Sequence, residues 1–426
     1  MFAKLKQLFS PASKDLRKRI YFTLMCLGLF CLGSNVTIPW ASAVYQELGF
    51  LEIFNLMSGG GLKSFSIFAL GVSPYITASI ITQLLQMDII PYFKELIEEG
   101  YTGRQKINRI TRYLGILFAI IQAYILTIVY MKGMSSMDIL KTTIVMTAGT
   151  CFLLWIGDEV TNKGIGNGMS LLIMAGIIQS LPSMFVTAFQ GFVTSGTYTT
   201  LVGSLLFAAF VLIYIFIIVG VVFIQLAERR IPIQYSNRTN SAYGAQTSFL
   251  PIKLNSAGVM PVIFAMTLLA IPTTIVNLIG NENAINFVNN YIVSTSPTGF
   301  VLYILLIMFF GYFYTFMELN PEEMSKNLNK NGGYIPGVRP GAETTNYISN
   351  IIGKLTIVGS IFLVIIAGLP ILFSKFSGLP SSVTIGGTGL LIVVGVAIET
   401  YKQIESSLVS REYKRGRRRR WKISFS

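Results

Sequence analysis

The side chains that most often carry catalysis or bind metals are scarce in this chain of 426 residues. It has no histidine, which removes the commonest metal ligand and the usual general base. Its three cysteines, Cys26, Cys31 and Cys151, lie inside apolar stretches, which is typical of buried packing rather than of a disulfide or metal site. No nucleotide-binding G-x-x-x-x-G-K-[ST] motif occurs. The sequence therefore predicts a protein that is not an enzyme and that has no cofactor or metal site.

Two pairs of isoleucines have the spacing that could line a functional surface. Ile76 and Ile80 are four residues apart in one apolar stretch, and Ile173 and Ile177 are four apart in another. This spacing places each pair on one face of a helix. Isoleucines on such a face ordinarily contact lipid or pack against a neighbouring helix, so spacing alone leaves their role open.

Long uncharged stretches must position these residues, and they define the class of the protein. Hydrophobic residues make up 52% of the chain and charged residues 12%, roughly half the charged share of a soluble domain. About 18 or more apolar residues cross the hydrocarbon core of a membrane. One run of 64 residues must hold two helices, because Leu181–Ser183 and Gly191–Thr200 interrupt it. We therefore expect an all-α polytopic membrane protein with ten transmembrane helices, in the runs 20–46, 64–87, 113–131, 142–157, 164–227, 254–281, 283–317, 355–374 and 376–398.

The distribution of positive charge predicts the orientation. If the N-terminus is cytoplasmic, 29 of the 33 lysines and arginines lie on the cytoplasmic side, and the four others are Lys63, Lys132, Lys141 and Lys375. Such a bias predicts a multi-pass protein of the plasma membrane with both termini in the cytoplasm. Cytoplasmic segments are then expected at 1–19 and 403–426, with long loops at 88–112, 227–254 and 318–354. The basic tail suits anionic lipid, with ribosome contact as the alternative.

A short internal repeat predicts two inverted halves. Gly71–Ile76 and Gly258–Ile263 share four of six residues, and each lies near the start of an apolar span. If 20–190 and 191–402 are two halves of five spans, the second enters the membrane from the opposite side. Such folds place their pathway between the repeats. This architecture suits either a secondary transporter of a small solute or a channel.

The polar residues within the spans favour a passive channel. Gln83, Gln122 and Asn255 are neutral amides, and no charged residue lies near the middle of a span. Ion-coupled transporters usually keep a charged residue there despite its cost. The transporter of a small solute remains the alternative.

Several motifs together resemble the SecY family, the channel subunits of the bacterial-type Sec translocon. They occur in the order of the family and cover four spans and the largest loop. The motifs are Ser-Gly-Gly-Gly-Leu at 58–62, Ser-Ile-Phe-Ala-Leu-Gly at 66–71, Pro-Tyr-Ile-Thr-Ala-Ser-Ile at 74–80, Gly-Ile-Gly-Asn-Gly at 164–168, Leu-Asn at 254–255, Ala-Gly-Val at 257–259, Pro-Gly-Val-Arg-Pro-Gly at 336–341, Gly-Gly-Thr at 386–388 and Leu-Leu-Ile-Val-Val at 390–394.

The resemblance implies a channel for unfolded polypeptides, with an hourglass pore, a plug and a lateral gate that opens to lipid. The plug would be a short re-entrant helix at about 58–72, a segment too short and too rich in glycine to span a membrane. The alternative for this segment is a glycine turn that leads into the second span. The expected plug residues are Gly59, Gly60, Gly61, Leu62, Phe65 and Ile67.

The resemblance also implies roles for residues along the rest of the chain. A ring of apolar side chains would line the constriction and exclude ions by dewetting. The ring residues are Ile76, Ile80, Ile173, Ile177, Ile263 and Ile392. The amides Gln83, Gln122 and Asn255 would form a polar cluster at the lateral gate, and Arg339, with Arg229 and Arg230, would dock the motor ATPase SecA or the ribosome. The implied partners are SecE, SecG, SecA or the ribosome, signal peptides and unfolded preproteins, together with anionic lipid.

The chain departs from the family in its first span. The family commonly has Phe-Arg-Ile-Gly there, whereas this chain has Phe-Cys-Leu-Gly at 30–33. The segment 234–250 is also poorer in cations than usual, and the tail is richer. These differences leave open whether the chain is a housekeeping channel or an accessory form.

Overall fold

A computed structural model describes residues 14–41, 52–86, 90–131, 135–194, 199–235, 248–279, 281–293, 296–377 and 389–408. The chain forms two compact units. Unit 1 comprises Met1–Thr187 and Val396–Ser426, and unit 2 comprises Ala188–Gly395. Most of the expected N-terminal segment 1–19 and most of the basic tail 403–426 lie outside the described residues.

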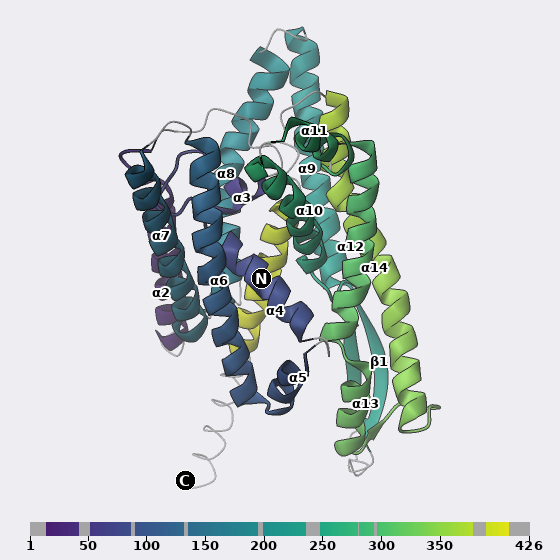
Figure 1. Cartoon of the computed structure of the whole chain (residues 1–426). Helices are drawn as coiled ribbons and strands as arrows, with labels where there is room; N and C mark the ends of the chain where they lie inside the picture. Colours follow the sequence, from purple (N-terminus) through teal and green to yellow (C-terminus); the bar gives the residue numbers. More distant parts are fainter. Residues whose placement is uncertain are drawn as a thin grey trace. The chain divides into compact units, whose positions relative to one another are not determined.

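Unit 1 is built from helices that pack closely through small residues. Its helices are α2 (Lys14–Ser34), α3 (Glu52–Met57), α4 (Ser73–Leu85), α5 (Pro91–Glu98), α6 (Tyr101–Tyr130), α7 (Ser136–Lys163) and most of α8 (Gly168–Phe189). The long helix α6 packs against both α4 and α7 (Figure 1). Its buried stripe includes Gly115, Ala119 and Ala123, four residues apart. Small residues at this spacing let helices approach closely in a membrane, and Gly115 lies against Tyr75 of α4.

Side chains from three helices hold the tight loop between α7 and α8. The Gly-Ile-Gly-Asn-Gly motif at 164–168 forms this loop. The Thr23 hydroxyl of α2 accepts a hydrogen bond from the Ile165 amide at 3.1 Å, and the Thr161 hydroxyl of α7 accepts one from Gly168 at 2.9 Å. Gln403 of the last helix, 389–408, accepts a hydrogen bond from the Gly166 amide at 2.7 Å. Two of these three backbone donors of the short turn are thus satisfied by distant parts of the chain.

Unit 2 combines long apolar helices with a small sheet. Its helical elements are a π-helical turn (Gln190–Thr194), α9 (Thr200–Leu226), α10 (Met260–Ile279), α11 (Glu282–Tyr291), α12 (Pro297–Glu318), α13 (Pro321–Lys330) and α14 (Ala342–Ser377). Helix α12 packs against both α10 and α14. The strands β1 (Glu228–Tyr235), β2 (Ser248–Lys253) and β3 (Gly333–Tyr334) form an antiparallel sheet in the order β2-β1-β3. The expectation of an all-α fold is therefore wrong for this sheet, and the fold is mostly helical.

The expected spans correspond to helices. In the described part of the chain, each of the ten expected spans overlaps a helix, and six helices are long and apolar enough to cross a membrane. Helix α8 continues past Pro182 to Phe189 rather than ending there. Proline within a membrane helix is tolerated where neighbouring groups satisfy the freed backbone.

The two copies of the repeat motif have the same local geometry. Gly71 has φ of +56° and lies two residues before α4, and Gly258 has φ of +61° and lies two residues before α10. Glycine adopts this left-handed conformation without steric cost. Pro74 and Pro261 are each the second residue of the helix that follows, where proline fits well. The repeat read from the sequence therefore marks two equivalent helix starts, one in each unit.

Candidate functional site

The expected plug segment, 58–72, folds in unit 1 as a compact loop whose ends meet. A side-chain carbon added at Gly71 would lie 3.3 Å from the Ser58 Cα. Within the loop, the Lys63 amide donates a hydrogen bond to the Asn55 side chain at 3.1 Å, and the Ser66 amide donates one to the Gly61 carbonyl at 2.9 Å. Loops of this kind, closed at the base and packed by their own side chains, are often functional.

The segment contains turns rather than the short re-entrant helix that we expected. The preceding helix, α3, ends at Met57, before the three glycines, and the next helix, α4, begins only at Ser73. Gly59 and Gly60 have φ of +72° and +85°, a left-handed backbone that stops a right-handed helix. The local structure agrees better with the alternative given for this segment, a glycine turn that leads into the next helix, than with a re-entrant helix.

Glycines on three helices of unit 1 make room for this segment. Added side chains at Gly33 of α2 and Gly149 of α7 would overlap the Phe68 ring and the Ile67 carbonyl. An added side chain at Gly176 of α8 would overlap the Met57 carbonyl, just before the segment, and would lie 3.1 Å from the Gly59 nitrogen. Such close backbone approach is a reason for glycine at each of the three positions. The segment is therefore enclosed by α2, α7 and α8.

Apolar side chains of the segment belong to the core of unit 1. Leu62 and Phe65 are 5% and 2% exposed and pack with residues of α6 and α7, among them Ala119, Ala123 and Met146. Within a membrane, such contacts stabilise a structure through close van der Waals packing. The segment is thus a packed part of unit 1 rather than a surface loop.

Two local features oppose this packing. Phe65 has φ of +44° and, in the described part of the chain, is the only residue other than glycine with a positive φ. A bulky residue in this region is strained by about 1–3 kcal/mol. The Ser66 hydroxyl is buried without a hydrogen-bond partner among the described residues, which also costs free energy.

Replacement of Ser66 by alanine is expected to stabilise unit 1, because the substitution removes a buried hydroxyl that has no partner. We expect a gain of about 1 kcal/mol, measured as a higher midpoint of thermal unfolding in detergent. The matched control is Ser58→Ala. Ser58 is equally buried, but its hydroxyl donates to the Asn55 carbonyl at 3.0 Å, so its removal should lower the midpoint. A lower midpoint for both variants would contradict the assignment of Ser66 as unpaired.

The expected ring residues lie on four helices. Ile76 and Ile80 are one turn apart on α4, and Ile173 and Ile177 are one turn apart on α8, all in unit 1. In unit 2, Ile263 lies on α10, and Ile392 lies in the last helix at 3% exposed. Five of the six are buried, and Ile80 is half-buried.

The amides expected at the lateral gate make local hydrogen bonds. The Gln83 side chain of α4 donates to the Ser79 hydroxyl at 3.3 Å, one turn earlier. The Asn255 side chain donates to the Gly258 carbonyl at 2.9 Å and thereby fixes the turn before α10. Gln122 is half-buried on α6, which packs against α4. Asn255 thus has a structural role at the second repeat motif, which the sequence did not indicate.

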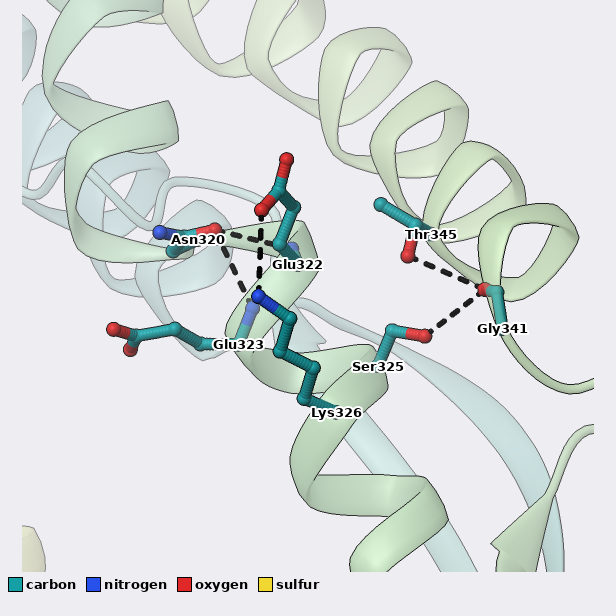
Figure 2. Close-up of polar contacts among 7 residues, drawn as sticks. All are labelled: Asn320, Glu322, Glu323, Ser325, Lys326, Gly341 and Thr345. Carbon is teal, nitrogen blue, oxygen red and sulfur yellow. Dashed lines mark hydrogen bonds and ion pairs between the residues drawn. The ribbon is translucent and has the colours of Figure 1, made fainter.

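The expected docking arginines lie in a module of unit 2 made of β1, β2, β3, α13, the turn at 335–341 and the start of α14, which we call the sheet module. Its core contains Ile231, Ile233, Ile252, Leu328, Ile335, Ile348 and Ile352. The Asn320 side chain caps α13 by accepting hydrogen bonds from the amides of Glu322 and Glu323 at 3.0 and 3.4 Å (Figure 2). Capping of this type stabilises a helix start by about 1 kcal/mol. The described parts of the segments expected as long loops at 227–254 and 318–354 therefore contain strands and helices.

Arg339 lies on a fixed turn of this module with its side chain exposed. Its carbonyl accepts a hydrogen bond from the Thr344 hydroxyl at 2.8 Å. Two residues later, the Gly341 carbonyl accepts hydrogen bonds from the hydroxyls of Ser325 and Thr345 at 3.2 and 3.3 Å (Figure 2). The turn thus has a fixed backbone from which the guanidinium projects, a good arrangement for recognition of an acidic partner.

Arg229 and Arg230 are exposed on β1 but point to opposite faces of the sheet, because side chains alternate along a strand. Arg230 forms an ion pair with Glu228 at 2.7 Å. Arg229 shares its face with Ile231. The two arginines therefore cannot both belong to one flat docking face.

The structure also identifies a residue that the sequence analysis missed. Phe68 packs between Phe30 of α2 and Phe152 of α7, and it covers Gly33. Phe30 and Gly33 are the two residues that this chain shares with the Phe-Arg-Ile-Gly stretch of the family. Their common spacing of three was the available signal, because it places both on one helix face. Leu32, between them, is 69% exposed.

Comparisons with known proteins establish the family. The SecY family model matches residues 66–401. The protein translocase subunit SecY of Bacillus subtilis is 44% identical over 414 residues, which cover 94% of this chain and 96% of that protein. The chain belongs to the SecY family.

Solved structures share the SecY/Sec61 fold of this chain. A structure of a protein-conducting channel matches with a TM-score of 0.69 at 20% identity over 93% of both chains. A second solved structure matches with a TM-score of 0.63 at 20% identity over 93% of both chains. In that SecY protein, the plug domain stabilises the closed state of the translocation channel and maintains a membrane seal. Sec61 in a canine ribosome–channel complex matches with a TM-score of 0.65 at 19% identity over 93% of both chains.

Proposed function

We propose that this chain forms a protein-conducting channel of the plasma membrane, passing unfolded polypeptides across the membrane and hydrophobic segments laterally into it. The observation that carries this proposal is the 44% identity to a protein translocase subunit over nearly the whole length of both chains. The relative is a translocase subunit, and the solved structures of the same fold are protein-conducting channels. A transporter of small solutes finds no support among them.

The architecture of the proposed channel is ten transmembrane helices in two inverted halves, with both termini in the cytoplasm. The equivalent starts of α4 and α10, each with a left-handed glycine two residues earlier, support the repeat. The segment 58–72 is the plug, and its enclosure by glycines of α2, α7 and α8 supports this role. The six isoleucines form the pore ring, and Gln83, Gln122 and Asn255 belong to the lateral gate.

The proposed partners follow from the sheet module and from the relatives. Arg339 docks a motor ATPase of the SecA type or the ribosome, and one of Arg229 and Arg230 contributes to the same contact. The ribosome complex of Sec61 supports a ribosome partner for this fold. SecE and SecG are the small subunits expected beside the channel. Signal peptides and unfolded preproteins are its substrates, and anionic lipid contacts the basic tail.

Site-directed crosslinking to a stalled polypeptide tests both the channel and the ring. A single cysteine at Ile177 or Ile263 is expected to crosslink to the stalled chain after Cys26, Cys31 and Cys151 have been replaced. The matched controls are Ile178→Cys and Leu268→Cys, on the same helices but 45% and 44% exposed. These positions should give little crosslinking, because they face away from the packed side of the helix.

Two outcomes would contradict the proposal. Equal crosslinking from the buried and the exposed positions would remove the ring assignment. No crosslinking at any position, together with saturable uptake of one small solute along an ion gradient, would replace the channel by a transporter.

A further inference from the structure

Phe68 joins the 58–72 segment to the helices on either side of it. Its ring stacks on Phe30 of α2 with centroids 6.2 Å apart and planes 2° apart, and on Phe152 of α7 at 6.1 Å. Trp155 in turn stacks on Phe152, with ring centroids 5.8 Å apart. Stacked aromatic pairs stabilise a contact beyond the apolar area that they bury. One side chain of the segment is therefore held between two helices that are distant from it in sequence.

Gly33 determines where this ring can lie. An added Cβ at Gly33 would overlap the ring atoms of Phe68, so the absence of a side chain creates the seat for the ring. Phe68 is 5% exposed and Phe30 is fully buried. The seat is thus specific in shape and is closed to solvent and lipid.

The ring of Phe68 is well packed, whereas the nearby residues Phe65 and Ser66 are in unfavourable arrangements. Phe65 has a left-handed backbone and Ser66 has an unpaired hydroxyl among the described residues, and both raise the free energy of the folded segment. Two backbone hydrogen bonds add to the attachment: Ile38 donates to the Phe65 carbonyl at 2.9 Å, and Ile67 donates to the Val36 carbonyl at 3.0 Å. The segment therefore combines a strong point of attachment with local strain, which suits an element that must be released.

We infer that Phe68 is the positioning residue of the plug: its ring, seated over Gly33, holds the closed arrangement, and withdrawal of the ring releases the segment. This inference rests on the proposed function and adds to it. The glycine-rich end of the segment fits against α8, and Phe68 determines whether the segment stays in place.

The first test is the resting conductance of the reconstituted channel complex in planar bilayers. Phe68→Ala is expected to raise this conductance by about tenfold or more, which corresponds to about 1.4 kcal/mol. Phe68→Leu keeps much of the apolar volume but has no ring to stack, so we expect a smaller rise. The leucine variant also provides a folded test protein if the alanine variant does not assemble.

A double-mutant cycle separates seating of the ring from general destabilisation. Gly33→Ala places a methyl group where the ring lies, so this variant alone should also leak. In Gly33→Ala combined with Phe68→Ala, the methyl group occupies vacated space, and the two leaks should not add. Gly28→Ala on the same helix is the control, because an added Cβ there has no atom within 4 Å. Additive leaks, or a leak in the Gly28 variant, would overturn the inference.

A reversible disulfide tests whether the leak of Phe68→Ala arises from movement of the segment, because it can hold the segment in place without the ring. Thr37 and Ser66 form an isolated antiparallel bridge. The hydrogen bonds on either side of the bridge make them a non-hydrogen-bonded pair, whose Cα atoms lie about 4.5 Å apart, within disulfide range. Thr37→Cys with Ser66→Cys, in a chain without the native cysteines, should restore low conductance to Phe68→Ala when oxidised. Reduction should restore the leak.

The outcomes distinguish this inference from the proposed function. If a channel lacking residues 60–67 leaks and Phe68→Ala does not, the role of Phe68 is wrong and the plug remains. If neither variant leaks, the plug assignment itself fails. If oxidation leaves the leak of Phe68→Ala unchanged, the leak does not arise from movement of this segment, and the inference is overturned.

Discussion

Deletion of residues 60–67 is expected to leave a folded channel that conducts small ions at rest. The ends of the segment lie close together, since Gly71 lies against Ser58 and a side-chain carbon at Gly61 would be 3.5 Å from the Phe68 carbonyl. Gly59 can therefore join Phe68 without a large change in the helices. The deletion removes Leu62 and Phe65 from the core of unit 1, and with them the body of the proposed seal.

Planar-bilayer conductance in the absence of substrate measures this effect, and we expect an increase of about tenfold or more. The control is Ser64→Ala within the same segment. It removes only hydroxyl contacts to the carbonyls of Gly60 and Gly61 at 3.4 and 3.3 Å, so the channel should stay closed. A deletion variant that assembles with its partners but has the conductance of the intact channel would show that 58–72 is not a plug.

Charge reversal at Arg339 is expected to reduce motor-driven translocation by about tenfold or more without loss of stability. The Arg339 side chain is exposed and lies outside the core of the sheet module, so the substitution should change the free energy of unfolding by less than about 0.5 kcal/mol. A glutamate at the same position would repel an acidic partner surface instead of attracting it. Vesicle translocation driven by SecA is the measurement.

Two further variants test whether the loss of translocation arises from Arg339 itself or from the change in net charge. Lys326→Glu reverses a charge on α13, where Lys326 is exposed and pairs with Glu322 at 3.7 Å, and it should leave translocation nearly unchanged. Thr344→Val removes the hydrogen bond that holds the Arg339 carbonyl, so it should lower the rate partially. Equal losses in the Arg339 and Lys326 variants would mean that net charge, rather than docking by Arg339, determines the rate.

The helices could be predicted because their signal is local. Uncharged runs predict helices in the described part of the chain, and the repeat motif marks the starts of α4 and α10 through Gly71 and Gly258. The sheet was missed because the local residues of β1 favoured a loop. Ile231 and Ile233 alternate with exposed residues, which is a strand pattern, but the neighbouring arginines and Pro232 made the segment read as a charged loop.

The candidate site was predicted less completely because its geometry depends on distant contacts. The three glycines at 59–61 indicated a break, but turns and a helix ending at Met57 could not be separated from a short helix by composition. The seat of Phe68 requires Gly33 and Phe152, which approach it only in the folded unit. The spacing of Phe30 and Gly33 places both on one face of α2, but nothing in the sequence brings Phe68 and Phe152 to that face.

The hydrogen bond between the Gly166 amide and the Gln403 side chain limits how early unit 1 can be completed during synthesis. The Gly166 amide belongs to a loop that is made early, whereas its acceptor is made 237 residues later. Unit 1 also contains residues from Val396 onward. The half of the protein that emerges first from the ribosome therefore cannot reach its final form until the last helix has been translated.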